Sequence, residues 1–521
     1  MSFVSIEFLL FILVTCVIYY ACPKRVKPFV LLLANYVFYI ISTGMLAIYL
    51  LVTTCIIYIS ARIIQKIEDR KDKIKQLDKE EKKIAKNKIK KQKKIAIVIS
   101  VIICLGILAV LKYTPFFVEI LNSILNVFKI HEITAVKHFL LPLGISYYTL
   151  QAISYIVDVY RGKYAAEKNF IKVALYMSFF PLMVEGPISR FDTLSEQLYA
   201  DNKFNYEQMK KGLTRIGWGF FKKLVIADRA ALFVNNVFGH SEYGGLVAGV
   251  AIILYTLQIY AEFSGCMDIV IGTAKLLGIK LSENFEQPFF SKSIQEFWRR
   301  WHITLGTWLK DYVFYPISLS KMNLNVSGAA KKHLPVHLSK FVIVAFPLFF
   351  VWFSNGLWHG ASLKYVLYGL YYYVIMMLGV LFEPVFKWII KIFKINTEVF
   401  SYKLFQMIRT AFLVLIGMTI FRAQTLTEAF NMLMAIFTKP SGASIFSLGL
   451  SLNQFLILFI SSVVLFFVSL AKENKIDVNE KLNEQNLVFR WLVYFAVITV
   501  IVVCGIYGIG YDASSFIYGQ F

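Results

Sequence analysis

Residues 341–361 read FVIVAFPLFFVWFSNGLWHGA, and the first seventeen of them carry no charged side chain. A helix that crosses a bilayer needs about 20 mostly apolar residues, so this run predicts a membrane helix that ends beside His359. Similar apolar runs recur along the chain, at 3–21, 28–41, 45–61, 95–111, 139–160, 171–184, 209–227, 246–277, 363–390, 404–421, 450–470 and 489–509. They predict an all-α, polytopic transmembrane protein with about 11–13 spans plus re-entrant or interfacial helices.

The composition of the whole chain agrees with this interpretation. The 521 residues are 58% hydrophobic and only 17% charged, and the mean hydropathy is +0.62. Soluble domains have about 45–50% apolar and about 25% charged residues. A soluble multidomain enzyme, a disordered chain and a secreted disulfide scaffold are therefore excluded. We expect a single membrane-embedded domain over 1–521, with the informative motifs concentrated at 139–423.

The basic residues are concentrated in one place. The chain has 55 Lys and Arg against 32 Asp and Glu, and residues 62–94 hold 15 of the former and 6 of the latter. This stretch lies between two apolar runs and carries no RNA-binding motif, so we expect no nucleic-acid partner. It predicts a basic cytoplasmic loop or helical extension near anionic membrane lipids, although a synthase subunit or a carrier protein is also a possible partner.

The positions of the basic residues also predict the orientation of the N-terminal half in the membrane. Lys24, Arg25 and Lys27 follow the first apolar run, and Arg161 and Lys163 follow the fifth. Because cytoplasmic loops are enriched in Lys and Arg, these clusters and the loop at 62–94 all predict an N-terminus on the outer face. The expected location is the bacterial cytoplasmic membrane.

Familiar metal and nucleophile motifs are missing from the sequence. The six cysteines form no CxxC pair, and there is no GxSxG elbow, P-loop or HExxH. We expect no bound metal. Ionisable residues within apolar runs are functional candidates instead, because charge is costly inside a membrane. They include Glu185, Glu262 and Asp268.

The densest polar segment is EFWRRWH at 296–302. Ser293 and Glu296 have the spacing of a capping box, so a helix is expected to begin near Ile294 and to continue past His302. This helix is too charged to span lipid and predicts an interfacial position, with His302 facing packed neighbours. A purely structural role for His302, with Arg299 and Arg300 as interfacial anchors, is the alternative.

His359 has a different setting. It follows the long apolar run at Asn355-Gly356 and precedes the small residues Gly360 and Ala361, which allow another backbone or a substrate to approach. Imidazole is the natural general base near neutral pH, so His359 is a candidate catalytic residue. A histidine that only satisfies the end of a helix is the alternative.

An ordered set of motifs now points to a family. The set comprises PLGISYYTLQAISY at 142–155, FPLMVEGPI at 180–188, YTLQIYAEFSGCMD at 255–268, ENFEQPF at 283–289, EFWRRWHITL at 296–305, WLKDY at 308–312, GLWHGA at 356–361 and FRA at 421–423. In this order they resemble the membrane-bound O-acyltransferase family, and within it the alginate O-acetylase membrane subunits of bacteria. Glu262 and residues 317–320 differ from what that branch leads us to expect, so the acceptor polymer stays open.

The resemblance implies a helical core around a central funnel, with His359 essential at its base and His302 on the donor side. It implies transfer of an acyl group, expected to be acetyl, from a cytoplasmic thioester to a hydroxyl for O-acetylation of an extracellular polysaccharide or cell-wall polymer. The thioester, acetyl-CoA or an acyl carrier, would be a co-substrate rather than a bound cofactor. The implied partners are an extracellular acyltransferase of the SGNH type and components of a polysaccharide synthase.

We hypothesise that His359 removes the proton of the acceptor hydroxyl, or forms a transient acyl-histidine. Asn355, the Trp358 N–H and His302 are candidates for stabilising the oxyanion. The further supporting candidates are Glu296, Arg299, Arg300, Trp301, Asp311 and Asp268. The competing interpretations are a teichoic-acid D-alanylation subunit and a non-catalytic transporter or scaffold for polysaccharide export.

Overall fold

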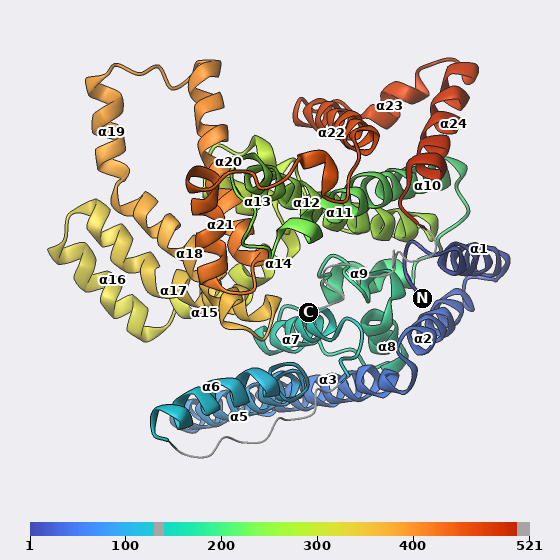
Figure 1. The fold of residues 1–521 in the computed structure, drawn as a ribbon. Coiled ribbons are helices and arrows are strands. Elements are labelled where there is room, and N and C mark those ends of the chain that lie inside the picture. The colour runs from blue at the N-terminus through green and yellow to red at the C-terminus, as the bar shows by residue number, and fades with distance from the viewer. Residues whose placement is uncertain (75, 130–139, 508–521) are drawn as a thin grey trace. The chain divides into compact units, whose positions relative to one another are not determined.

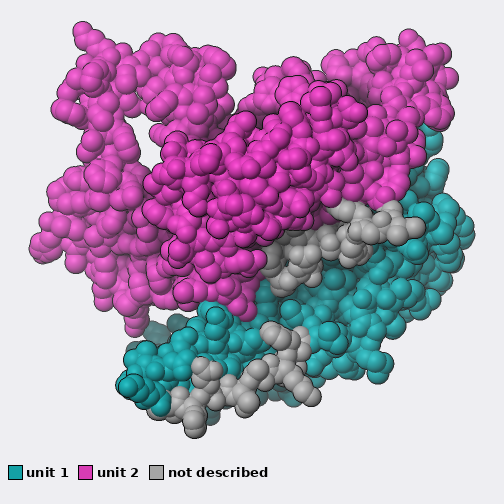
Figure 2. All heavy atoms as spheres, in the orientation of Figure 1, with its two compact units in different colours: residues 1–213, 270–282 teal, residues 214–269, 283–521 magenta. Residues whose placement is uncertain are grey.

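The computed structural model describes residues 1–74, 76–129 and 140–507. The chain divides into two compact units, Met1–Leu213 with Val270–Ser282 and Thr214–Ile269 with Glu283–Phe521 (Figure 2). The described residues form helices, and their only β-type pairing is an isolated bridge between Phe285 and Trp301.

The first unit is built mainly from the helices near the N-terminus, which are drawn in blue to teal in Figure 1. Lys93, in the N-terminal half of α5, is buried and binds Glu68 at the end of α3 (2.7 Å) and the Tyr160 carbonyl (3.0 Å). The stretch at 62–94 is thus largely helical, as one of the two sequence interpretations required. The helices of this unit are α1 (Ile6–Ala21), α2 (Lys27–Thr43), α3 (Ala47–Glu68), α4 (Arg70–Lys73), α5 (Lys79–Leu108), α6 (Thr114–Val127), α7 (Ile145–Arg161), α8 (Phe170–Ser178) and α9 (Phe191–Leu198).

Two helices pass from one unit into the other, α10 (Tyr206–Phe220) and the long α12 (Gly245–Leu276). The second unit continues with the π-helical segment η4 (Phe221–Ala227), α11 (Asp228–Val237), α13 (Ile294–Arg300), α14 (Ile303–Leu309), the π-helical η6 (Lys310–Phe314), α15 (Tyr315–Ser318), α16 (Lys321–His333), α17 (Val336–His359), α18 (Leu363–Leu381), α19 (Glu383–Ile392), α20 (Phe400–Arg422), α21 (Leu426–Thr438), α22 (Leu452–Glu473), α23 (Val478–Asn483) and α24 (Leu487–Cys504). Short 3-10 turns are η1 (Gly44–Leu46), η3 (Phe180–Leu182), η5 (Pro288–Phe290) and η7 (Ile445–Ser447).

Eight helical segments of the described chain are long and apolar enough to cross a membrane. They are Lys27–Lys73, Lys79–Val127, Gly245–Leu276, Val336–His359, Leu363–Leu381, Phe400–Arg422, Leu452–Glu473 and Leu487–Cys504. The chain is therefore an all-α, polytopic membrane protein, with fewer candidate spans than the 11–13 predicted. Several apolar runs do not form separate long helices: Lys27–Lys73 covers two of them, α1 has only 16 residues, and the run at 171–184 breaks at η3.

Two glycines allow α17 and α18 to pack as a close antiparallel pair. A methyl group on Gly356 would strike the Tyr365 carbonyl, and one on Gly369 would strike the Trp352 carbonyl. The missing side chains let the two backbones approach, so the aromatic residues near the end of α17 lie directly against α18. This packing fixes the position of His359, the last residue of α17.

The expected continuous helix through His302 is wrong. The helix does begin at Ile294, with the Ser293 hydroxyl accepting from the Glu296 N–H (3.1 Å), but α13 ends at Arg300 and α14 begins at Ile303. The preceding segment causes the break: the Glu286 N–H donates to the Arg300 carbonyl (2.9 Å), and the Ile303 N–H donates to the Asn284 carbonyl (3.0 Å). These bonds hold the backbone at His302 out of the helix.

Candidate functional site

His302 occupies the corner between α13 and α14. Its backbone is left-handed, with φ 49° and ψ 50°, a conformation that is unusual for a residue other than glycine and that is found preferentially at functional sites. The side chain is 2% exposed and lies edge-on to Phe263, with ring centres 4.8 Å apart. Burial lowers the pKa of His302 to about 3, so the ring is neutral at physiological pH.

Asn284 holds the loop on which His302 lies. Its Oδ1 accepts hydrogen bonds from the Thr304 N–H and the Thr304 hydroxyl, both at 3.0 Å, and lies 3.4 Å from His302 Nδ1. Its Nδ2 donates to the sulfur of Met267 (3.3 Å). Because Oδ1 can only accept, this contact favours the tautomer with hydrogen on Nδ1 and a lone pair on Nε2. Asn284 lies in the motif at 283–289, but the sequence alone did not indicate its role.

His359 is surrounded by aromatic rings. It is 4% exposed, and its ring lies edge-on to Tyr368 (5.9 Å between centres) and Phe421 (5.2 Å). At the next residue, Gly360, a methyl group would strike the Tyr365 ring and force it to move. The small residue predicted to admit a neighbour does so, and the neighbour is an aromatic side chain of α18.

The two histidines share Trp358 as a neighbour. The ring centre of Trp358 lies 5.5 Å from that of His302 and 5.0 Å from that of His359. Residues that are 57 positions apart in the sequence are thereby brought to one buried location. The structure thus unites the two histidines that the sequence singled out.

Several buried polar atoms around this location have no hydrogen-bond partner among the residues that the structure describes. They include His302 Nε2, Asn355 Oδ1, Trp298 Nε1, Trp352 Nε1 and the Tyr372 hydroxyl. The rings of Trp298, Trp352 and Tyr372 contact one another, with centres 4.8–5.4 Å apart. Native proteins leave few buried polar groups unsatisfied, and such groups often mark a place for water or substrate. The cluster is therefore a candidate binding site.

The charged residues of the 296–302 segment serve the local structure. Glu296 accepts from the Lys292 N–H (2.9 Å) and pairs with Arg300 (2.7 Å), which also binds Glu473 (2.6 Å). Arg299 is exposed. The structure therefore directs these three residues away from the aromatic cluster at the histidines.

Two more candidates take other positions. Trp301 is buried among Tyr260, Phe285 and Phe297 and stacks on Phe297 with ring centres 5.4 Å apart. Asp311 is half-buried in η6. Trp301 stabilises the corner at His302 by packing.

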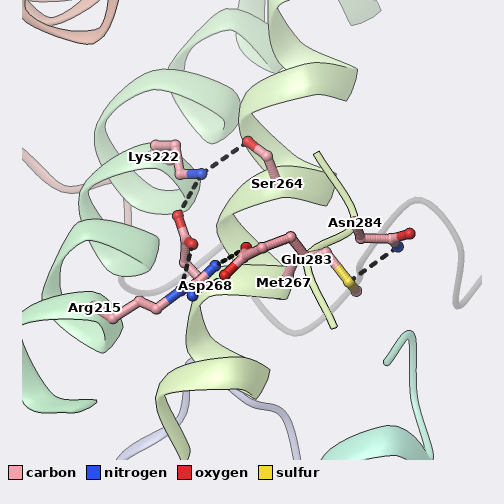
Figure 3. A network of polar contacts seen from close by, with 7 residues as sticks. All are labelled: Arg215, Lys222, Ser264, Met267, Asp268, Glu283 and Asn284. Atoms are coloured by element: carbon pink, nitrogen blue, oxygen red, sulfur yellow. Dashed lines mark hydrogen bonds and ion pairs between the residues drawn. The ribbon is translucent and has the colours of Figure 1, made fainter. Parts of the chain in front are cut away.

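Asp268 belongs to a buried network of charges (Figure 3). Its carboxylate binds Arg215 (2.8 Å) and Lys222 (2.7 Å), and Lys222 also donates to the Ser264 hydroxyl (2.9 Å). Arg215 in turn binds Glu283 (2.6 Å). Asp268 is thus a member of an ion-pair cluster rather than a direct neighbour of the histidine rings in these contacts.

The neighbouring lysine, Lys223, forms a second buried group of ion pairs with two carboxylates. Lys223 binds Asp228 (2.8 Å) and Glu262 (3.0 Å), and all three side chains are at most 4% exposed. The sequence analysis singled out Glu262 and Asp268 but missed Asp228 and both lysines. The available signal was two adjacent lysines within the apolar run at 209–227, which is as unexpected there as a carboxylate.

No group of three or more His, Cys, Asp or Glu side chains suited to a metal ion occurs within the described residues. The described polar groups at the candidate site are those of two histidines, an asparagine and aromatic N–H and O–H groups.

Comparison with known proteins shows which class this chain resembles. Residues 165–416 match the sequence profile of MBOAT, the membrane-bound O-acyltransferase family. That range contains both histidines, Asn284 and the aromatic cluster. Over residues 165–416 this chain is therefore similar to the membrane-bound O-acyltransferase family.

The relatives refine the class. Proteins named "probable alginate O-acetylase AlgI" from Pseudomonas syringae pv. tomato and Pseudomonas aeruginosa are each 34% identical, over 66% of this chain and 60% of their own length. A peptidoglycan O-acetyltransferase of Helicobacter pylori is 32% identical over 53% of this chain and 54% of its own, and a teichoic acid D-alanyltransferase of Bacillus subtilis is 30% identical over 47% and 60%. The chain spans about 60% of the length of the alginate O-acetylases that it matches.

Proposed function

We propose that this protein is an O-acyltransferase that moves an acyl group, expected to be acetyl, from a cytoplasmic thioester toward a hydroxyl of an extracellular polysaccharide or cell-wall polymer. The observation that carries the proposal is the pair of buried histidines that share Trp358 within an O-acyltransferase domain. The names of the relatives support it, since all of them refer to acyl transfer onto an envelope polymer.

In the proposed reaction the hydroxyl attacks the thioester carbonyl while His359 takes the hydroxyl proton. The proton transfer avoids release of a free alkoxide, and a positioned base contributes about 10²–10⁴-fold. The thiolate leaves as the tetrahedral intermediate collapses and recovers a proton. The buried aromatic surroundings of His359 keep water from hydrolysing the thioester.

His302 has a different role in this mechanism. With hydrogen on Nδ1 and burial that keeps the ring neutral, Nε2 offers a lone pair and no proton. It therefore accepts a hydrogen bond from bound substrate rather than stabilising an oxyanion. Asn355 and the Trp358 N–H remain the proposed donors to the oxyanion.

The proposed orientation has the N-terminus outside, in a bacterial cytoplasmic membrane. Lys24, Arg25 and Lys27 follow α1, and the ammonium of Lys27 donates to the Asn202 carbonyl (2.7 Å). Tyr20, near the end of α1, donates to the Leu276 carbonyl at the end of α12 (2.8 Å). By the positive-inside rule this end of α12 faces the cytoplasm, where acetyl-CoA and acyl carriers occur.

The proposed partners follow from the direction of transfer. An acyl group that reaches the outer face must still be passed to the polymer there, and we propose that an SGNH-type acyltransferase does this together with polysaccharide synthase components. The basic helical extension at 62–94 contacts anionic lipids of the inner leaflet.

The deciding experiment measures ester-linked acetate in exopolysaccharide and wall polymers of cells that carry wild-type protein or His359→Ala at equal membrane levels. We expect at least a hundredfold loss from one polymer, since the base is removed. His333→Ala, at an exposed position, is the control and should retain wild-type acetylation. Normal acetylation in His359→Ala would refute the catalytic role.

Teichoic-acid D-alanylation is the second candidate, supported by the Bacillus subtilis relative. Ester-linked D-alanine is therefore measured in the same samples. Loss of ester-linked D-alanine with unchanged acetate in His359→Ala would show that the transferred acyl group is D-alanyl rather than acetyl.

A further inference from the structure

A polar cavity of about 50 Å³ lies in the second unit, beside the Arg215–Asp268 ion-pair cluster. Its walls come from α10, η4, α12, α22 and the segment that leads to α13. The polar side chains that line it include Arg215, Lys222, Ser264, Asp268, Asn284 and Lys472. A bound water molecule needs about 10–15 Å³ of cavity space, so this cavity has room for about four water-sized groups.

One cation of the cavity lining lies outside the direct ion pairs described above. Arg215 and Lys222 are paired with Asp268 and Glu283 (Figure 3). Lys472, at the end of α22, is exposed and makes no direct ion pair among the described residues, although its charge acts on Asp268 from a greater distance. Three cations and two carboxylates give the lining a net charge of +1, which favours an anion.

The cavity reaches the wall behind His302. Met267 and Asn284 both line it, and they are bonded to each other (3.3 Å). Asn284 is also the residue that contacts His302 Nδ1. A group bound in the cavity is therefore separated from His302 by one side chain.

The depth of the cavity suits a ligand from the cytoplasm. Asp268 lies two turns, about 12 Å, before the end of α12 at Leu276. That end is the one proposed above to face the cytoplasm.

We propose that this cavity is a phosphate subsite for the thioester donor, with Lys472 as the residue that recognises the phosphate and Lys222 as a second donor of hydrogen bonds. The ammonium of Lys222 has three N–H groups and gives one each to Asp268 and Ser264, which leaves one for a ligand. This inference rests on the proposed function, because it assigns the donor of that reaction. Acetyl-CoA and the phosphopantetheine arm of an acyl carrier both contain phosphate, so the subsite accepts the chemistry that they share.

The test measures equilibrium binding of CoA, which carries no acyl group, to the purified full-length protein in detergent. Binding of 4′-phosphopantetheine and of pantetheine, which lacks the phosphate, is measured alongside. We expect Lys472→Met to weaken CoA binding about tenfold, Lys472→Arg to retain it, and pantetheine to bind more weakly than 4′-phosphopantetheine. Lys475→Met removes the same charge from an exposed position outside the cavity lining and should bind CoA as the wild type does.

Equal CoA binding by the wild type and Lys472→Met would overturn the proposal, as would equal binding of pantetheine and 4′-phosphopantetheine. A Lys472-dependent response to both phosphate compounds supports the phosphate that CoA and carriers share. A Lys472-dependent response to CoA alone supports a nucleotide phosphate and makes CoA the donor.

The binding assay involves no transfer, so it is independent of the proposed reaction. CoA binding that depends on Lys472 in a protein that fails to acylate any polymer would support the subsite and refute the transferase. If Lys472→Met acetylates the polymer and binds CoA as the wild type does, the result would refute the subsite and support the transferase.

Discussion

At the residue scale, the neutrality of His302 is a property of its surroundings. The ring is enclosed by Phe263, Trp358 and Asn284, with no carboxylate among these contacts. A protonated imidazole would lose its hydration there without gaining a counter-charge. His302 is therefore suited to accept a hydrogen bond over the whole physiological range.

This neutrality predicts a penalty in acid. The pKa of His302 is about 3 in the folded protein and about 6.5 when unfolded. Below pH 6.5 the unfolded chain binds a proton that the folded chain does not, so stability falls as pH falls toward 3. By pH 5 this group alone costs about 2 kcal/mol.

His302→Gln should therefore lose less stability than the wild type between pH 7 and pH 5. Thermal unfolding of the purified proteins in detergent measures this difference. His333→Gln, at an exposed position, serves as the control. An unchanged acid penalty in His302→Gln would show that the ring is not the group responsible.

At the element scale, the tight pairing of α17 and α18 sets the position of His359. The pairing depends on Gly356 and Gly369, where any side chain would strike the facing backbone. Forced overpacking of this kind costs about 1–3 kcal/mol. The cost falls on the region that contains both Trp358 and His359.

Gly369→Ala should therefore lower the thermal stability and reduce acyl transfer together. Gly379→Ala lies on the same helix, where the added methyl would make ordinary contact with Gln295 at 3.6 Å. The control variant should retain activity and be slightly more stable, since alanine favours a helix over glycine. Both quantities are measured on proteins purified in parallel, and equal behaviour of the two variants would contradict the packing argument.

The same scale shows what sequence can and cannot predict. The start of α13 at Ser293 was predictable because its cap is local. The break at His302 was not, because it is made by bonds from Asn284 and Glu286, about 16 residues earlier in the chain. Glu262 and Asp268 were recognised by their unfavourable setting, yet their partners Arg215, Lys222 and Lys223 lie 39–53 residues earlier in the chain and are brought to them only by the fold.

At the scale of the whole molecule, the basic clusters predict one orientation for the N-terminal half. Lys93 and Glu68 pair within the helical extension, which is continuous with α3 and α5. If the cytoplasm lies on this side, the extension is enclosed in intact cells.

Lys83→Cys, in the exposed part of α5, tests the orientation. A thiol reagent that cannot cross membranes should label it in inverted vesicles and not in intact cells. The unsubstituted protein, with its own six cysteines, gives the background. Labelling of Lys83→Cys in intact cells would reverse the orientation.

The paired charges of η4 and α12 also constrain how the protein is made. Lys222 and Lys223 leave the ribosome about 40 residues before Glu262 and Asp268, to which they bind. An unpaired lysine or aspartate at the centre of a membrane helix costs about 2.5–3.5 kcal/mol during insertion. The two carboxylates of α12 therefore make it energetically costly for this helix to insert into the membrane on its own. In the folded protein these carboxylates are paired with lysines that precede them in the chain, so the helix enters a stable environment only together with η4.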